Sequence, residues 1–308
     1  MNKLEYYTPD DIPAEIQAYD AKVEQLGVGK SGKVGILNVE FQANNSGKTI
    51  ITKQFSQVPL QIQRVLYLED SLPEMAYLYV ISPSGGILQG DRYRTDILLK
   101  NNAIAHVTTQ GATRIYSMNA NSASQILNIT VNENCYLEYI PDQIIPYKNS
   151  RYYQKVNLEV HDKSTLIYSE IVTPGRVAME ESFEYDICYL RTHCKNQNGI
   201  IRILENTKIE PKKQKLKDLG VLGEFNIVGT VYILTRKNDV MDIENSINEY
   251  IKDKKLSSVG TSILSDGSGI IIRILGTKTD TIFDVIYKIL EISRKKILGA
   301  SFTKTRKN

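Results

Sequence analysis

Three segments of this chain align with one another without gaps, and this internal repeat restricts the possible folds more than any other feature. They read DILLKNNAIAHVTTQ, NITVNENCYLEYIPD and NLEVHDKSTLIYSEI and begin at Asp96, Asn128 and Asn157, so their starts lie 32 and 29 residues apart. Each contains a short apolar strand, a polar turn and a second strand. A period of roughly 20–50 residues is typical of stacked supersecondary units. The repeat predicts a β-helical or stacked-hairpin architecture, with a plain β-sandwich as the alternative.

Further strand-like segments surround the repeat. Short runs rich in β-branched and aromatic residues, such as KVGILNVEF and QILNITV, are separated by Asn, Gly, Asp or Lys. We therefore predict a mainly β fold, with a C-terminal mixed α/β portion that carries two helices. We expect a single domain consisting of an N-terminal segment (1–33), a β-rich body (34–217) and an α/β C-terminal part (218–308). No Pro-, Gly- or Ser-rich linker separates the last two parts.

The C-terminal part has the pattern of two amphipathic helices and a hairpin. In the first helix, apolar residues recur at helical spacing: Val240, Ile243, Ile247 and Ile251. The second helix has a stronger apolar stripe in DTIFDVIYKILEISRKKILG. Its acidic start and its basic end at Arg294, Lys295 and Lys296 suit the helix dipole, and Gly299 is a typical C-terminal stop. Between the helices, GTSILSDGSGIIIRILG predicts a hairpin around the Asp-Gly pair at 266–267.

The glycine-rich stretch SPSGGILQGD, residues 82–91, invites interpretation as a phosphate-binding loop. Such a loop binds its anion at the N-terminus of a helix. Here the following residues, 92–99, alternate with a period of two, which predicts a strand instead. We therefore expect a structural turn. Gly85, Gly86 and Gly90 would supply backbone geometries that other residues resist, and Asp91 would cap the loop by hydrogen bonding.

Signals of catalysis are weak in this sequence. The GKS at Gly29–Ser31 and the GKT at Gly47–Thr49 lack the earlier glycine that a nucleotide-binding loop requires, so we expect turns there. No Ser or Cys nucleophile stands in a recognisable elbow, and no pair of carboxylates lies in a motif that orients an acid and a base. The sequence thus assigns no catalytic residue, and we expect no enzymatic activity.

Metal-binding signals are also few, because the chain has no Cys-x-x-Cys and no His-x-x-x-His. Two pairs of residues nevertheless share offsets in successive repeat units: His106 with Glu138, and Gln110 with Asp142. If the units stack, His106 and Glu138 lie about one strand spacing apart, roughly 4.8 Å. His106, Glu138 and Asp142 are thus candidates for a weak, transient site for a borderline divalent ion. Ordinary polar residues on a strand face are the alternative.

Composition favours a cytoplasmic protein. The three cysteines are odd in number and widely scattered, which indicates no disulfide framework. The N-terminal residues lack the apolar core of a signal peptide, and no segment is long and apolar enough to span a bilayer. A net charge of +3 does not by itself indicate a nucleic-acid partner. The basic run PKKQKLK at 211–217 contains no aromatic residue, so we expect a solvated connection there and no RNA-binding patch.

Four motifs occur in a fixed order: SGGILQGD, TTQGATRIY, LEYIPDQIIPY and EIVTPGR. Their succession resembles the urease accessory protein family UreD, also called UreH. The family's glycine loop falls on Gly85, Gly86, Gly90 and Asp91. Its Thr-Thr-Gln-x-Ala-Thr segment begins at Thr108 and continues through Thr109, Gln110, Ala112 and Thr113. Its Leu-Glu-aromatic-x-Pro segment falls on Leu137, Glu138, Tyr139 and Pro141, and its Gly-Arg pair on Gly175 and Arg176.

The likeness extends from about Gly32 to Ser301, and its departures are modest. Tyr139 stands where a Trp is common in the family, and Arg114 where a Lys is common. The usual Pro-Arg-x-Trp ending is reduced to TKTRKN, which retains only Arg306. This shortened ending bears on whatever contact the C-terminal tail makes in the family.

The resemblance implies a non-enzymatic maturation factor with a helically wound β body. It would act as a scaffold that joins UreF and the GTP-hydrolysing UreG to apo-urease, so that nickel reaches the urease active site. The resemblance implies no tightly bound cofactor and only transient nickel, because a tight site would not release its ion. The absence of a phosphate-binding loop from this sequence agrees with nucleotide hydrolysis by UreG.

Two other functions compete with this interpretation. A carbohydrate-active β-helix enzyme would also have stacked strands with acidic faces, but the absence of a secretion signal and of Trp stacking surfaces disfavours it. A nucleic-acid scaffold would depend on residues 212–217 and the basic C-terminus alone. We therefore expect neither nucleic acid nor membrane among the partners.

Overall fold

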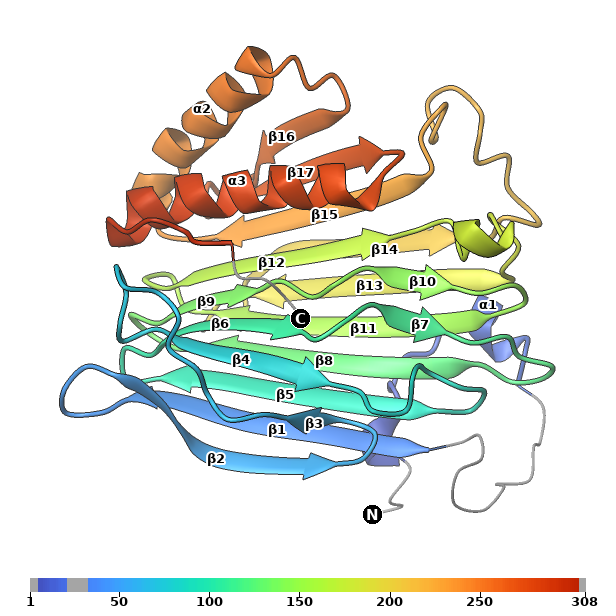
Figure 1. The fold of residues 1–308 in the computed structure, drawn as a ribbon, viewed down its shortest axis with the longest axis horizontal. Helices are drawn as coiled ribbons and strands as arrows, with labels where there is room; N and C mark the ends of the chain where they lie inside the picture. Colours follow the sequence, from blue (N-terminus) through green and yellow to red (C-terminus); the bar gives the residue numbers. More distant parts are fainter. Residues whose placement is uncertain (1–4, 21–32, 305–308) are drawn as a thin grey trace.

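Two facing β-sheets form the body of the molecule (Figure 1). The computed structural model describes residues 5–20 and 33–304. The first sheet, sheet A, has the strand order β14-β13-β11-β8-β5-β1-β2. Its strands are β1 (Val34–Ala43), β2 (Thr49–Gln57), β5 (Arg92–Lys100), β8 (Ala123–Val131), β11 (Arg151–Val160), β13 (Ile187–Lys195) and β14 (Ile201–Ile209).

Sheet B faces sheet A and has the order β16-β17-β15-β12-β9-β6-β4-β3, while β10 pairs with β12 and β7 off this path. Its strands are β3 (Gln61–Ile62), β4 (Ala76–Ile81), β6 (Ile104–Thr109), β7 (Thr113–Ile115), β9 (Tyr136–Tyr139), β10 (Ile144–Pro146), β12 (Thr165–Val172), β15 (Ile227–Leu234), β16 (Val259–Ile263) and β17 (Gly269–Gly276).

Each predicted repeat unit is one coil of this stack. The first unit supplies β5 and β6, the second β8 and β9, and the third β11 and β12. In sheet A, β5, β8 and β11 pair in parallel, and in sheet B, β6, β9 and β12 do the same. The two strands of a unit lie in different sheets, so each unit is a coil and its strands form no hairpin. This parallel stacking confirms the β-helical fold class and differs from the antiparallel pairing of a plain β-sandwich.

Alternate side chains of the strands fill the space between the two sheets. In β5 the inward residues Tyr93, Thr95, Ile97 and Leu99 are each at most 2% exposed, whereas Arg94 on the other parity lies on the outer face. This alternation confirms the strand predicted after the glycine loop. Close packing of such a two-layer core makes each coil depend on its neighbours above and below.

Antiparallel strands lie at the ends of the parallel stack. In sheet A, β2 pairs antiparallel with β1, and β14 pairs antiparallel with β13. In sheet B, β15 pairs antiparallel with β12, and β17 and β16 follow in the same sense. The C-terminal part thus continues sheet B directly from the β-rich body.

The two predicted helices are present and cover the C-terminal extension of sheet B (Figure 1). They are α2 (Lys237–Asp253) and α3 (Thr279–Leu298), and the predicted hairpin between them is β16 and β17. Gly299 ends α3 in the left-handed conformation, with a φ of 67°. The apolar stripes of both helices pack on isoleucines of β15 and β17 to form a second core. Within the described residues, none of the helices is both long and apolar enough to cross a membrane.

The first described residues, 5–20, lie against the outer face of sheet A. They contain η1 (Glu5–Tyr7) and the short α1 (Ala14–Gln17), whose Ile16 packs on Tyr153 and Tyr189. Asp10 and Asp11 both form ion pairs with Lys155 of β11. The N-terminal segment is therefore fastened to the coils by both apolar and charged contacts.

The structure also shows one of the two predicted GK-containing turns and the predicted basic connection. Gly47 lies in the turn between β1 and β2 with a φ of 83°, whereas Gly29–Ser31 lie outside the described residues. The basic run at 211–217 is a largely exposed connection between β14 and β15, anchored by the buried Leu216 and by an ion pair between Lys212 and Asp186. Its predicted character as a solvated connection is confirmed.

Candidate functional site

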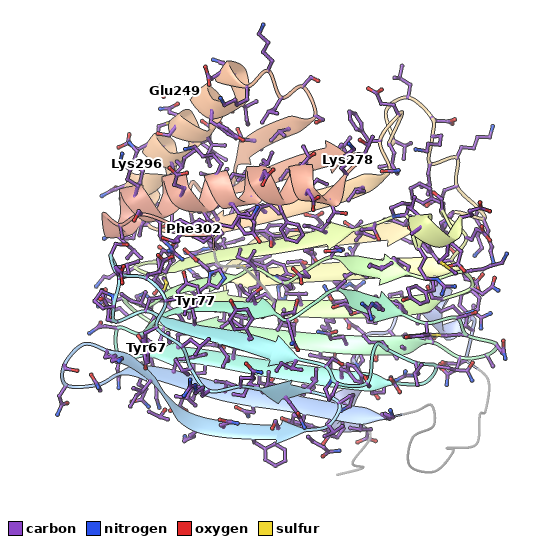
Figure 2. The ribbon with its side chains drawn as sticks, in the orientation of Figure 1. Tyr67, Tyr77, Glu249, Lys278, Lys296 and Phe302 are labelled. Atoms are coloured by element: carbon purple, nitrogen blue, oxygen red, sulfur yellow. The ribbon has the colours of Figure 1, made fainter. Side chains whose placement is uncertain are left out.

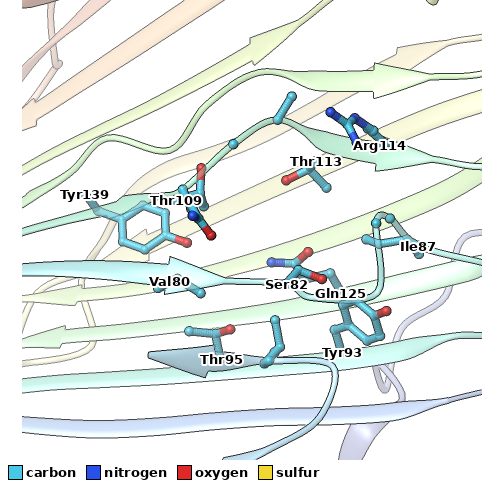
Figure 3. A pocket seen from close by; sticks show the side chains of 16 residues that line it. Val80, Ser82, Ile87, Tyr93, Thr95, Thr109, Thr113, Arg114, Gln125 and Tyr139 are labelled. Atoms are coloured by element: carbon cyan, nitrogen blue, oxygen red, sulfur yellow. The ribbon is translucent and has the colours of Figure 1, made fainter. Parts of the chain in front are cut away.

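Three of the motif segments meet around one cavity at the ends of β4 and β6 (Figure 3). The cavity has a volume of about 360 Å³. The glycine loop after β4 forms one side, and the loop between β6 and β7 forms the other. The motif residues in its lining are Gly85, Gly86, Thr109, Gln110, Ala112, Thr113 and Tyr139. Residues some twenty positions apart come together here because successive coils place strand ends side by side.

The glycine loop has the geometry of a tight structural turn. Gly85 and Gly90 both have a φ of 75°, a conformation that side chains with a Cβ atom resist. Gly86 is constrained by space, because a Cβ atom there would lie 2.5 Å from the Tyr116 ring and 2.6 Å from the Arg114 carbonyl oxygen. The three glycines are thus required for two different physical reasons.

Asp91 holds this loop to the neighbouring coil. Its Oδ1 accepts the backbone N–H of Lys33 at 2.8 Å, and its Oδ2 accepts the N–H of Leu88 at 2.9 Å and the hydroxyl of Tyr93 at 3.0 Å. Asp91 is fully buried, and burial raises the pKa of its carboxyl group above the ordinary value. The expected cap is therefore present.

Substituting Gly86 with valine should destabilise the protein by about 1–3 kcal/mol, because the backbone or the Tyr116 ring must shift to admit the side chain. Urea denaturation of both proteins would measure this loss. Gly111→Val is the matched control, since Gly111 lines the same cavity and a Cβ atom there would have no other atom within 4 Å. Equal stability of the two variants would contradict the steric explanation.

A smaller inner cavity of about 40 Å³ lies between the sheets and shares Thr109, Thr113, Gln125 and Tyr139 with the outer cavity. Asp142 and Glu170 are the carboxylates in its lining. The outer cavity therefore borders the interior of the coil stack.

Glu170 is an acid inside this interior. Its Oε2 accepts hydrogen bonds from Gln154 Nε2 and Tyr168 OH, each at 3.0 Å, and its Oε1 accepts one from Thr192 at 3.3 Å. Burial raises the pKa of Glu170 to about 7, and the hydrogen bonds oppose this only in part. The group thus titrates near neutral pH.

His106 and Glu138 occupy paired positions of β6 and β9, as the shared offset predicts. His106 Nδ1 lies 2.6 Å from Glu138 Oε2. Adjacent side chains of a strand point to opposite faces of the sheet. Tyr139 points into the space between the sheets, so Glu138, and His106 beside it, point to the other face, toward α3. Asp142 instead lines the inner cavity. Among residues 5–20 and 33–304, no group of three or more His, Cys, Asp or Glu is gathered as a metal site, so the three candidates do not form one cluster.

Glu138 belongs to a buried ion cluster, which we define as Glu69, Tyr77, His106, Glu138 and Arg294. Arg294 Nε donates to Glu138 Oε1 at 2.8 Å, and Nη2 donates to Glu138 Oε2 at 2.7 Å. Arg294 also pairs with Glu69 and donates to Tyr77 OH at 2.9 Å. Although burial opposes ionisation, the hydrogen bonds from Arg294 and His106 hold the pKa of Glu138 low, at about 2. The cluster fastens α3 to sheet B.

The position of Arg294 corrects the helix-dipole interpretation of the basic end of this helix. Arg294 is fully buried, whereas Lys295 and Lys296 are exposed. Phe302 lies between the α3 ribbon and Tyr77 in the view of Figure 2. Its ring covers the guanidinium group of Arg294, with 4.8 Å between Arg294 Cζ and the ring centroid. The sequence itself indicates this burial. Arg294 lies four residues after Leu290, about one helical turn, and so falls on the same apolar face.

Comparison with known proteins identifies the family. The model of the UreD urease accessory protein family matches residues 33–308. The chain belongs to the UreD family. It is 48% identical over 283 residues to the urease accessory protein UreD of Cenarchaeum symbiosum, which covers 92% of this chain and 99% of that protein. It is 35% identical over 289 residues to the urease accessory protein UreD 2 of Brucella suis, with 93% and 95% coverage. The family resemblance predicted from the sequence is confirmed.

The remaining UreD motif residues make structural contacts within and between the coils. Thr108 Oγ1 donates to the Ile140 carbonyl oxygen at 2.5 Å, and Leu137 is buried between the sheets. Gly175 has a φ of 134°, and a Cβ atom there would lie 2.9 Å from a backbone oxygen. Arg176 pairs with Glu181 and lies over the Tyr147 ring. Pro141 borders the inner cavity.

Proposed function

We propose that this UreD protein is a non-catalytic scaffold of urease maturation, which joins UreF and UreG to apo-urease so that nickel enters the urease active site. The observation that supports it is the near end-to-end likeness to proteins named urease accessory protein UreD, at up to 48% identity. A match over 92% of this chain and 99% of the relative includes the coils, the glycine loop and the C-terminal helices alike.

The chemistry of the outer cavity agrees with a non-catalytic role. Its described lining holds Ser, Thr, Gln, Tyr and one Arg, together with glycines and apolar residues, and contains no His, Cys, Asp, Glu or Lys. General acid–base catalysis depends on groups that titrate near the working pH. Burial raises the pKa of the two tyrosines in this lining, Tyr93 and Tyr139, so neither of them titrates near neutral pH.

For nickel we propose only transient contact with this chain. Asp142 lines the inner cavity, where a carboxylate oxygen could meet a passing ion without enclosing it. His106 and Glu138, the other two predicted contacts, are already engaged with each other and with Arg294. A contact through a single carboxylate releases its ion readily, as a delivery protein requires.

We further propose a cytoplasmic location, with no nucleic acid or membrane among the partners. Cys135, Cys188 and Cys194 are all unpaired and buried, as suits a reducing compartment.

Co-expression tests this proposal. Apo-urease, UreF and UreG are produced with and without this chain, and urease activity and nickel content are scored together. We expect both to be lost without the chain and restored when it is supplied from a second plasmid. Full activity and full nickel content in its absence would overturn the proposal. Turnover of an acidic polysaccharide by the pure protein would then favour the carbohydrate-active alternative.

A further inference from the structure

We propose that the outer face of sheet A beneath residues 5–20 is a docking surface for an acidic segment of a partner protein. Residues 5–20, which we call the strap, cover this face and must leave it when the partner binds. This role rests on the proposed function, because a scaffold of urease maturation must bind other proteins. Three features support it: the charge of the strap, a pair of like charges beneath it and the way in which the strap is held.

The strap is acidic and lies outside the part of the chain that matches the family. It contains no Lys or Arg, and its acids are Glu5, Asp10, Asp11, Glu15 and Asp20. The family model begins its match at residue 33, so it includes the strands beneath the strap but not the strap itself. The covered face thus belongs to the common UreD body, and the segment that covers it does not.

Beneath the strap, two cations occupy adjacent positions of sheet A. Lys155 of β11 and Arg191 of β13 are paired in parallel register. Like charges at adjacent strand positions repel each other. Asp11 relieves this repulsion, because its Oδ1 lies 2.8 Å from Lys155 Nζ and its Oδ2 lies 2.5 Å from Arg191 Nη1. Among the described residues, every ion-pair partner of these two cations comes from the strap. The cation pair therefore attracts another anion when the strap is away.

An apolar shelf lies beside the cation pair on the same two strands. Tyr153 and Tyr189 precede the two cations by two residues, so their side chains point to the same face of the sheet. Their rings stack with 5.7 Å between the centroids. Ile16 of the strap is 1% exposed and packs on this shelf together with Ile187. The face thus fits an acidic segment that carries one aliphatic residue, as the strap itself does.

The strap is held in a way that permits exchange for another segment. A single backbone–backbone hydrogen bond joins its described residues to the coils, from the N–H of Asn121 to the carbonyl oxygen of Tyr19. The side chains of Asp10 and Asp11 are 87% and 41% exposed. Ion pairs in such positions add little stability and are screened by salt. A partner segment with the same chemistry can therefore compete for the face.

Peptide binding tests the surface itself. The probe is a labelled synthetic peptide of residues 5–20, EYYTPDDIPAEIQAYD. The release variant is the full-length chain with Asp11→Lys/Ile16→Asn, which removes the bridging anion and the apolar anchor of the strap. It should bind the peptide at least about tenfold more tightly than the natural protein, in which the strap already occupies the face. An unchanged circular dichroism spectrum checks that the release variant is folded.

Glu5→Lys is the matched control for the release variant. It makes the same change of charge as Asp11→Lys at an exposed position of the strap, whereas the ion pairs with sheet A are formed by Asp10, Asp11 and Glu15. The strap should therefore stay in place, and the control should bind the peptide as weakly as the natural protein does.

Two changes test the role of charge. Adding Lys155→Gln/Arg191→Gln to the release variant should weaken peptide binding at least about tenfold, because the cation pair is lost. A peptide with Asp10→Asn and Asp11→Asn should lose affinity for the release variant by a similar factor. Added salt should weaken binding of the natural peptide more than binding of this neutralised peptide.

Purified UreF, UreG and apo-urease are then titrated separately into the release variant and the natural protein. One of them should bind the release variant at least about tenfold more tightly, and the peptide of residues 5–20 should compete with it. If the peptide binds but none of the three gains affinity, the docking proposal fails. The scaffold proposal fails independently, if urease activity and nickel content in co-expression do not depend on the natural chain.

Four further outcomes would overturn the assignment. Failure of the peptide to bind the release variant would show that the face is no docking surface. Unchanged peptide affinity after Lys155→Gln/Arg191→Gln would place the binding elsewhere. Tighter binding of oligothymidylate than of the peptide would indicate a nucleic acid as the occupant. A dimer of the natural protein in sedimentation that dissociates in the release variant would indicate the strap of a second copy.

Discussion

Replacing Arg294 with methionine is expected to lower the free energy of unfolding by about 3–5 kcal/mol, because two buried carboxylates would lose their cation. Glu69 and Glu138 have side chains that are 1% and 0% exposed, so water cannot take the place of the guanidinium group. Urea denaturation of the variant and the natural protein would measure the difference.

Two further variants separate this effect from loss of packing. Lys295→Met is the matched control on the same helix; its side chain is exposed, so a change within about 0.5 kcal/mol is expected. Neutralising both acids in Arg294→Met/Glu69→Gln/Glu138→Gln should recover part of the lost stability, because no uncompensated charge remains buried. If the single Arg294 variant were as stable as the Lys295 control, the cluster would not hold α3.

Replacing Glu170 with glutamine should make the protein more stable at pH 8, by about 3 kcal/mol, and should change little at pH 4.5. The folded-state pKa of about 7 lies above the ordinary value of 4.5, so the folded protein binds the proton more tightly than the unfolded chain. The stability that this proton provides is complete below about pH 4.5. It is lost as the pH rises to 7, because the buried carboxyl group must then ionise.

Glutamine suits the site because its oxygen can accept from Gln154 and Tyr168, while its NH₂ group can donate to the Thr192 hydroxyl. Denaturation midpoints of both proteins from pH 4.5 to 8 would give the difference at each pH. Glu249→Gln, at an exposed position of α2, is the control and should show no such pH-dependent difference. Glu138, with a pKa of about 2, contributes its pH dependence below this window. A constant difference across the range would contradict the assignment to Glu170.

The stack of coils could be predicted from the sequence because each repeat unit carries its own strand–turn–strand pattern. The offset shared by His106 and Glu138 even predicts their adjacency, since parallel strands in register place equal positions side by side. The helices were equally predictable from their apolar stripes and from Gly299. These features depend on local periodicity, which a single sequence contains.

The candidate site was less predictable because it depends on which coil lies beside which. Nothing local to Gly86 indicates that Tyr116 and Arg114 of the next segment leave no room for a Cβ atom. Arg294 resembles an ordinary basic helix end until Glu69 and Glu138 are known to lie opposite it. A pairing across more than 150 residues has no periodic signal.

That long separation has a consequence for biosynthesis. Arg294 follows its partners Glu138 and Glu69 by 156 and 225 residues, so the ribosome releases it long after both acids have emerged. Domains begin to fold from the N-terminal side during translation. Glu138 faces α3 and not the space between the sheets, so coils that close early leave this face of sheet B, with its acids, open to water until the helix docks. Completion of the body must wait for the last helix, and a chain truncated before that helix is expected to remain a target for proteases.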